Sequence, residues 1–182
     1  MTSSLSTTEG EQPTNTPSTT EGGEQSPTTP TPVDTTAAAA TPAGPCPPPW
    51  TLVDGHCYRH VSLGAPADFA AADGQCGLLA AGGRLASLHT ARQLEFCWHH
   101  PSRPAAQQWV GLELFIIVIP PATEFRNSAD GSRPDIAHLE ELIEGDPAGW
   151  CLSLPADRGA GRLLRTSGLT RLSAAVCERP AG

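Results

Sequence analysis

The first 45 residues of this 182-residue chain contain no cysteine, no aromatic residue and no basic residue. Beyond Met1, their only sizeable apolar side chains are those of Leu5 and Val33. A segment of this composition cannot bury enough apolar surface to offset the entropy lost on ordering. The sequence therefore predicts a disordered Thr/Ser/Pro-rich stalk or linker over residues 1–45, followed by one folded domain over residues 46–182.

Long apolar segments are also missing. No apolar run approaches the ~20 residues that a membrane span needs, and the longest, residues 115–119, has five. The N-terminus has neither the basic region nor the apolar core of a signal peptide. Because the cysteines described below point to secretion, we expect the chain to be a fragment of a longer precursor. The alternative is an unusual route of export.

Positive charge is scarce. The formal net charge is −8, and the first 45 residues contribute five acidic side chains and no base. No basic stripe is present that could contact a row of phosphates, so we do not expect a nucleic-acid partner.

The six cysteines all lie in the predicted domain, at positions 46, 57, 76, 97, 151 and 177. An even number at wide spacing is typical of a disulfide framework, and hence of an oxidising compartment. The lack of a Cys-x-x-Cys pair disfavours a zinc ribbon or a thioredoxin-like site. The alternative is a reduced cytosolic protein with buried thiols.

The predicted stalk contains a repeat. Residues 6–12 and 18–25 share Ser-Thr-Thr-Glu-Gly, and threonine and proline follow each copy closely. Dense Ser/Thr with Pro is typical of an O-glycosylated, mucin-like stalk, the alternative being an unmodified linker. Neither Asn15 nor Asn127 lies in an Asn-x-Ser/Thr sequon, so N-glycosylation is not expected.

Periodicity and turn signals in the domain predict helices early and strands late, which is an α+β arrangement. Asp54-Gly55 indicates a turn between Cys46 and Cys57, which we expect to be bonded to each other. The expected helices are one with Pro66 in its first turn, ended by Gly82-Gly83; one from a Thr90/Gln93 capping box to Pro101; and one over residues 134–144. The expected strands cover residues 84–88, 109–119, 150–154, 162–166 and 173–178. The apolar run 115–119 is expected in the core; if exposed, it would form an association surface.

Several short motifs lie in order along the domain. They are Cys46-Pro47 with Trp50 and Cys57-Tyr58; Phe69 and Ala72 before Cys76; Gly82-Gly83-Arg84-Leu85-Ala86-Ser87-Leu88; Glu95-Phe96; Trp109-Val110-Gly111-Leu112; Asp130-Gly131-Ser132; and Val176-Cys177-Glu178. Together they resemble the C-type lectin-like domain family over residues 46–178. The resemblance implies an α+β, disulfide-stapled fold with two helices, small antiparallel sheets and a long irregular loop region.

The resemblance also implies a long-range disulfide between Cys76 and Cys177. Closing a loop of about one hundred residues is worth ~4–5 kcal/mol in the chain-entropy model. The family usually adds a loop bridge that would begin at Cys151, but no cysteine stands near the partner position, Leu169. A Cys97–Cys151 bridge, two free thiols and an intermolecular bond are all open, although the first is expected to exceed the ~7 Å Cα limit.

Calcium in this family is held by a Glu-Pro-Asn or Gln-Pro-Asp triplet and a Trp-Asn-Asp triplet, because Ca²⁺ takes about six to eight oxygen ligands. The positions that align here are Asp146, Pro147, Ala148, Leu164, Arg165 and Thr166. One carboxylate is left and a cation replaces an oxygen ligand, so we expect no metal, no cofactor and no calcium-dependent sugar site. Asn127 and Leu142 stand where the family often has tryptophan. Whether Pro147 keeps the family's cis peptide is open.

The remaining clusters favour surface roles. Residues 97–100, Cys-Trp-His-His, are expected at a solvated helix end, and Glu140, Glu141 and Glu144 on the wet face of a helix. The arginines at 158, 162, 165 and 171 are expected either to solubilise the surface or to meet an acidic partner, such as a sulfated glycan. No enzyme activity is predicted.

Together, the sequence predicts an extracellular or cell-surface recognition and adhesion module. It would bind a protein or glycan ligand without calcium, through the loops of residues 111–150 and the strand near Arg165. One alternative is a carbohydrate-binding lectin with a non-standard site. Another is a structural surface or matrix glycoprotein in which the stalk matters more than the head.

Overall fold

The computed structural model describes residues 45–118 and 121–182, so the predicted stalk lies outside the described residues except for Pro45. The helices are α1 (Phe69–Leu79), α2 (Ala91–His99) and the single 3-10 turn η1 (Leu139–Leu142). The strands are β1 (Thr51–Val53), β2 (His56–Ala67), β3 (Arg84–Leu85), β4 (Gln108–Val118), β5 (Pro121–Asn127), β6 (Ile143–Gly145), β7 (Cys151–Leu154), β8 (Leu163–Thr166) and β9 (Leu172–Pro180). None of the described helices is long and apolar enough to cross a membrane.

Side-chain caps fix where the two α-helices begin. At α1, Asp68 Oδ1 accepts a hydrogen bond from Ala71 N at 2.9 Å. The predicted start at Pro66 is wrong, because β2 stays paired with β9 as far as Ala67 and Pro66 is part of that strand. At α2, the predicted capping box between Thr90 and Gln93 is confirmed, and the helix ends before Pro101 as expected.

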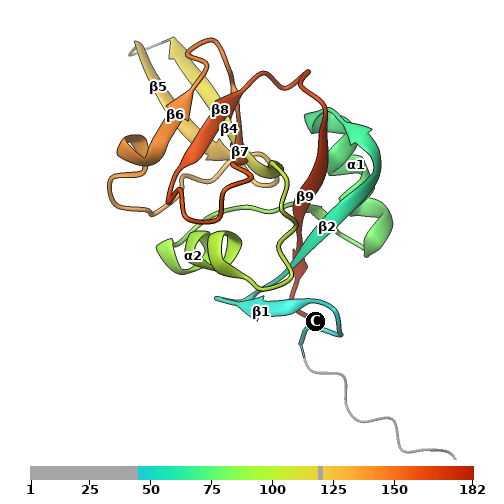
Figure 1. Ribbon diagram of the computed structural model, residues 1–182. Helices are drawn as coiled ribbons and strands as arrows, with labels where there is room; N and C mark the ends of the chain where they lie inside the picture. Colours follow the sequence, from blue (N-terminus) through green and yellow to red (C-terminus); the bar gives the residue numbers. More distant parts are fainter. Residues whose placement is uncertain (1–44, 119–120) are drawn as a thin grey trace, which may run out of the picture. The chain divides into compact units, whose positions relative to one another are not determined.

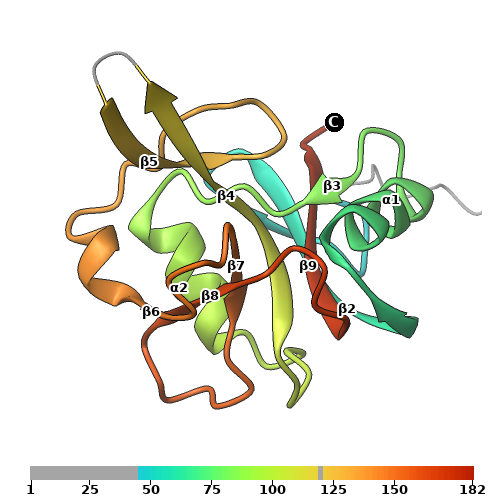
Figure 2. The same ribbon diagram turned by 90° about the horizontal axis from the view of Figure 1, so that it is seen from above.

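The strands form one mixed sheet in the order β1-β2-β9-β4-β7-β8-β6, with β3 paired to β9 and β5 to β4. Most pairs are antiparallel, but β4–β9 and β6–β8 are parallel. In both views α1 and α2 lie on opposite sides of the β2–β9 pair, while the β4–β5 hairpin projects away from it (Figures 1 and 2). The first described residue and the last are joined by a hydrogen bond from Gly182 N to Pro45 O.

Two apolar cores lie on the two faces of the sheet, since successive strand residues point in opposite directions. Trp109 packs with Phe69 and Cys76 in one core, whereas its neighbour Val110 packs with Leu94 of α2 in the other. The same alternation separates three further pairs of neighbours: Cys57 and Tyr58, Leu85 and Ala86, and Ala175 and Val176. The sheet is therefore covered on both faces, which explains why β4 and β9 bury apolar side chains on both of their faces.

Two disulfides close the domain. Cys46 is bonded to Cys57, and Cys76 of α1 is bonded to Cys177 of β9, with Cα–Cα distances of 5.5 and 5.4 Å. Cys97 and Cys151 are free and fully buried. Of the three arrangements open from sequence, the structure has two free thiols, and their burial leaves neither sulfur accessible to a second molecule.

We expect Cys97 and Cys151 to resist alkylation in the native chain, because burial raises the pKa of both thiols. Mass spectrometry after iodoacetamide treatment should find no label under native conditions and two labels after unfolding without a reductant. Native labelling of either residue, or no free thiol after unfolding, would contradict this arrangement.

The predicted helix over residues 134–144 is wrong. Asp135 N donates to His89 O and forms a β-bridge with Thr90, so the chain is extended there. His138 adopts a left-handed backbone conformation, with φ of 57°, and only η1 is helical before β6 begins. Ile136 and Leu139 are buried as the helical spacing suggested, but they reach the core from an extended segment and a single 3-10 turn.

Candidate ligand-binding surface

The two sequence segments aligned with a calcium site do meet in space, where the loop after β6 packs on β8. Arg165 of β8 donates from Nη2 to Pro147 O at 2.7 Å. It also donates to Gly149 O, from Nε at 3.1 Å and from Nη2 at 2.9 Å. A guanidinium group thus clamps two carbonyl groups of the 146–149 loop.

Several other polar atoms of this region are also engaged within the chain. Asp146 Oδ1 accepts from Ala148 N at 2.9 Å, which closes a tight turn. Thr166 Oγ1 lies 3.0 Å from Ser153 Oγ and is buried against β7. Leu164 contributes its carbonyl oxygen to both hydroxyls. The peptide before Pro147 is trans, since the cis peptide among the described residues is Pro48–Pro49.

Two glycines allow the loop to approach β8 this closely. Gly145 has φ of +105°, and a Cβ there would lie 2.7 Å from Arg165 O. A Cβ on Gly149 would lie 2.7 Å from Thr166 N. Because the colliding atoms belong to the backbone, a larger residue at either position would push the loop away from the arginine that clamps it.

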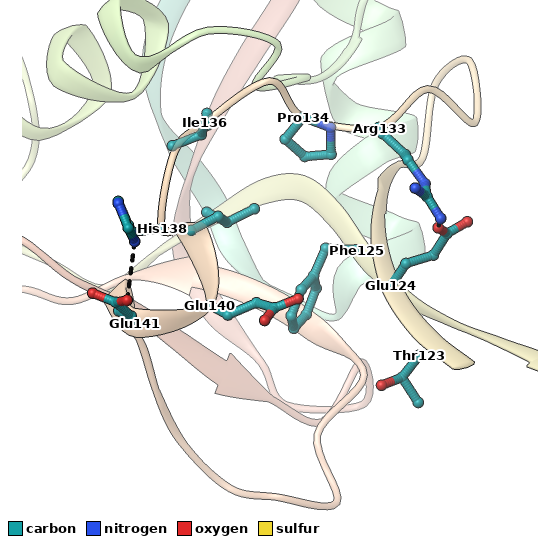
Figure 3. A pocket seen from close by; sticks show the side chains of 10 residues that line it. Thr123, Glu124, Phe125, Arg133, Pro134, Ile136, His138, Glu140 and Glu141 are labelled. Atoms are coloured by element: carbon teal, nitrogen blue, oxygen red, sulfur yellow. Dashed lines mark hydrogen bonds and ion pairs between the residues drawn. The ribbon is translucent and has the colours of Figure 1, made fainter. Parts of the chain in front are cut away.

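A pocket of about 420 Å³ lies between β5 and η1. A neighbouring pocket of about 330 Å³ shares Thr123, Phe125 and Glu140 with it, and extends to Leu114, Ile143 and Arg165. Phe125 extends from β5 and Glu140 from the η1 side toward the same space (Figure 3). The two pockets together make a groove, which we call the β5 groove, that ends at the Arg165 clamp.

Charged side chains line the β5 groove unevenly. Glu124 forms ion pairs with both Arg126 and Arg133. His138 Nδ1 lies 3.0 Å from Glu141 Oε1, as the dashed line in Figure 3 marks. Glu140 is exposed, and its carboxylate has no ion-pair or hydrogen-bond partner among the described residues. It is therefore the carboxylate in this groove that is available to an incoming group.

The β4–β5 hairpin, whose strand β5 lines this groove, also carries exposed apolar residues. Phe115 is 43% and Ile116 75% exposed, so the prediction that this run is core is wrong for these two residues. The side chains of residues 117–119 lie outside the described part. The pairing of β4 with β5 satisfies the backbone of this stretch and leaves its side chains on the surface. Their exposure fits the alternative, an association surface.

No family model and no curated protein sequence matches this chain, but solved structures do. The cow C-type carbohydrate-recognition domain of CD23 is 21% identical with a TM-score of 0.54, over 76% of this chain and 98% of that one. Ovocleidin-17 of the Gallus gallus eggshell calcified layer is 21% identical with a TM-score of 0.53, over 75% and 99%. A Ca²⁺-dependent type II antifreeze protein is 21% identical with a TM-score of 0.54, over 74% and 99%. The chain has a C-type lectin-like fold.

The residues of this C-type lectin-like fold do not fit calcium at the positions that the sequence aligned with a calcium site. Ca²⁺ needs several oxygen ligands, preferably carboxylates. Here the carboxylate of Asp146 accepts a hydrogen bond from the loop backbone, and the carbonyl groups of Pro147 and Gly149 face a guanidinium. Among the described residues there is no group of three or more His, Cys, Asp or Glu side chains that could hold a metal.

The remaining arginines do not form a free basic patch. Arg158 donates to Arg103 O, and Arg162 pairs with Glu144. Of the four arginines singled out in the sequence, only Arg171 is exposed without a hydrogen bond or ion pair within the described chain. A site for a sulfated glycan therefore gains no support from this set.

Other predicted clusters are structural. Cys97 and Trp98 are buried and only His99 of the helix end is exposed, while the ring of His100 stacks on that of His60 at 5.5 Å. Asn127 accepts from Leu88 N at 2.7 Å and is buried, so it fixes a loop. The sequence interpretation missed Phe125 and expected Glu140 to be exposed, but gave it no binding role; no sequence pattern that we used brings these two residues together.

Proposed function

We propose that the domain is an extracellular recognition module that binds a protein or glycan ligand without calcium. The observation that supports this most strongly is the Arg165 clamp, because a fixed positive charge stands where calcium-dependent relatives of this fold would need anionic oxygen ligands. The two disulfides support an oxidising, extracellular location. Recognition would use the β5 groove and the exposed apolar residues of the β4–β5 hairpin.

Comparison with proteins of the same fold supports recognition over catalysis. The CD23 domain was solved in the presence of an oligosaccharide, ovocleidin-17 belongs to a calcified eggshell layer, and the third protein is an antifreeze protein. A shared fold does not specify a ligand, so the ligand of this chain has to be argued from its own groove.

Calcium is expected to leave the melting temperature of the full chain unchanged. A cation that binds only the folded state would stabilise it by RT ln(1 + c/Kd), which grows with the calcium concentration c, whereas this site already holds an internal cation. Differential scanning calorimetry in calcium and in a chelator tests this directly. A melting temperature that rises with calcium concentration would overturn the proposed mode of binding.

Replacing Arg165 by glutamine is expected to lower the free energy of unfolding by about 1–3 kcal/mol, since hydrogen bonds from a charged donor to two carbonyl groups are lost. The change should also increase proteolysis within residues 145–149. Arg171→Gln is the matched control, because Arg171 is exposed and makes no hydrogen bond within the described chain. Equal unfolding curves for the two variants would show that Arg165 is not a clamp.

A further inference from the structure

The strand β5 has a free backbone edge. It pairs with β4 only. Ser128 N donates to Gly111 O at 2.8 Å, which makes Leu112 and Asn127 a non-hydrogen-bonded pair. Counting by twos along the antiparallel register, the N–H and C=O groups of Phe125 and Thr123 then point away from β4. The same geometry is seen at Asn127, whose N–H points outward to Ser132 O.

This edge opens onto the β5 groove. Thr123, Glu124 and Phe125 are consecutive, and all three line the pocket. Because side chains alternate between the two faces of a strand, three consecutive lining residues mean that the strand presents its edge to the space. No described residue makes a hydrogen bond to the backbone of Thr123 or Phe125. Unpaired strand edges of this kind are templates for an added strand.

The side chains around the edge determine which sequence of an added strand would fit best. Leu114, Phe125 and Ile143 offer an apolar surface at one end of the groove. Glu140 stands on the opposite wall as a carboxylate without an internal partner (Figure 3). The chain's own first 45 residues carry five acidic side chains and no base, so their charge does not match this wall.

We propose that the β5 groove binds an extended segment of a partner protein by strand addition to β5. The segment hydrogen-bonds to Thr123 and Phe125 through its backbone, places an apolar side chain against Phe125 and Leu114, and pairs a lysine or arginine with Glu140. This inference rests on the proposed recognition function and names its ligand class. A glycan could contact the pocket side chains but would not match the donor and acceptor repeat of a strand edge.

The test uses the full chain and an array of seven-residue peptides that alternate valine with lysine or valine with glutamate. We expect the valine–lysine peptides to bind, and their N-methylated versions, which lack backbone donors, to lose binding at least tenfold. In a titration followed by NMR, the amide signals of Thr123 and Phe125 should shift most. If acidic peptides bind as well as basic ones, or N-methylation has no effect, strand addition is refuted.

Two pairs of variants separate the contribution of backbone hydrogen bonds to peptide binding from the contribution of charge. Thr123→Pro removes an outward N–H that β4 does not use, and should weaken peptide binding about tenfold or more, whereas Thr123→Val should bind as the wild type does. Glu140→Gln should weaken binding about three- to five-fold. Glu144→Gln is its control, because Glu144 pairs with Arg162 outside the groove.

The outcomes also distinguish this inference from the proposed function. Suppose that the wild type and Thr123→Pro bind a glycan array equally well and that no peptide binds. That result would retain calcium-free recognition and overturn strand addition. If the chain self-associates in sedimentation experiments and Thr123→Pro abolishes this self-association, the edge binds a second copy of this chain. That result would overturn the proposal of a peptide partner.

Discussion

Replacing both Cys76 and Cys177 by alanine is expected to lower the free energy of unfolding by about 4–5 kcal/mol, a large share of the stability of a domain of this size. The bridge links α1 to β9 across a sequence separation of 101 residues. Without it, the unfolded chain gains the conformational freedom that the closed loop had removed. Guanidinium or thermal unfolding followed by circular dichroism measures the loss. Both cysteines are replaced together so that no reactive thiol is left behind.

The second disulfide provides the matched control. Cys46 and Cys57 are only 11 residues apart, so removing this bridge should cost about 2 kcal/mol less in the same chain-entropy model. Each pair is fixed at a similar Cα–Cα distance, 5.4 and 5.5 Å, so loop length is the main difference between them. An equal or smaller cost for the Cys76–Cys177 pair would contradict the view that α1 and β9 are held mainly by this covalent link.

Acid is expected to destabilise the domain through His60. Burial lowers the pKa of His60 to about 4, and the neighbouring His100, Arg103 and Arg158 act in the same direction, while the hydrogen bond to Gln108 opposes them. In the unfolded chain the pKa is about 6.5. Between these values the unfolded state binds a proton that the folded state does not. The free energy of unfolding should therefore fall by roughly 3 kcal/mol as the pH drops from about 6.5 to about 4.

His60→Asn tests this prediction, because an asparagine amide can keep the hydrogen bond that His60 Nδ1 makes to Gln108 Oε1 at 2.8 Å. The variant should lose most of the pH dependence in this range. His99→Asn is the control, since His99 is exposed on α2. Burial also raises the pKa of Glu178, so protonation of this carboxyl group stabilises the folded state as the pH falls. Glu178 is present in all the proteins compared, so its effect cancels in the difference between the pH dependence of the wild type and that of the variant. The same slope in all three proteins would refute the assignment to His60.

Much of the scaffold could be predicted because its signals are local or covalent. The capping box of Thr90 and Gln93 depends on residues three positions apart, and α2 begins where it was expected. The ordered motifs around Cys76, Trp109 and Cys177 indicated a C-type lectin-like fold, which the solved structures of the same fold confirm. The pairing of Cys76 with Cys177 came from that resemblance and is the one found in the structure.

The errors lie where distant segments decide the outcome. Ile136 and Leu139 have helical spacing, but a backbone hydrogen bond from Asp135 to His89 holds their segment extended. Phe115 and Ile116 are apolar enough for a core, but they lie on a hairpin that projects away from both cores. Apolar spacing reports which residues favour burial, and tertiary contacts determine which of them are buried.

The sequence by itself determined the number of cysteines, the capping box of α2 and the shortage of carboxylates at positions 146–148 and 164–166, because each depends on residue identity or on neighbours a few positions apart. Only the tertiary structure decided that Arg165 clamps the carbonyl groups of Pro147 and Gly149, and that the edge of β5 faces a groove beside Glu140. Those arrangements join residues 15 to 18 positions apart in the sequence, and the distances between them are set by the packing of the whole sheet.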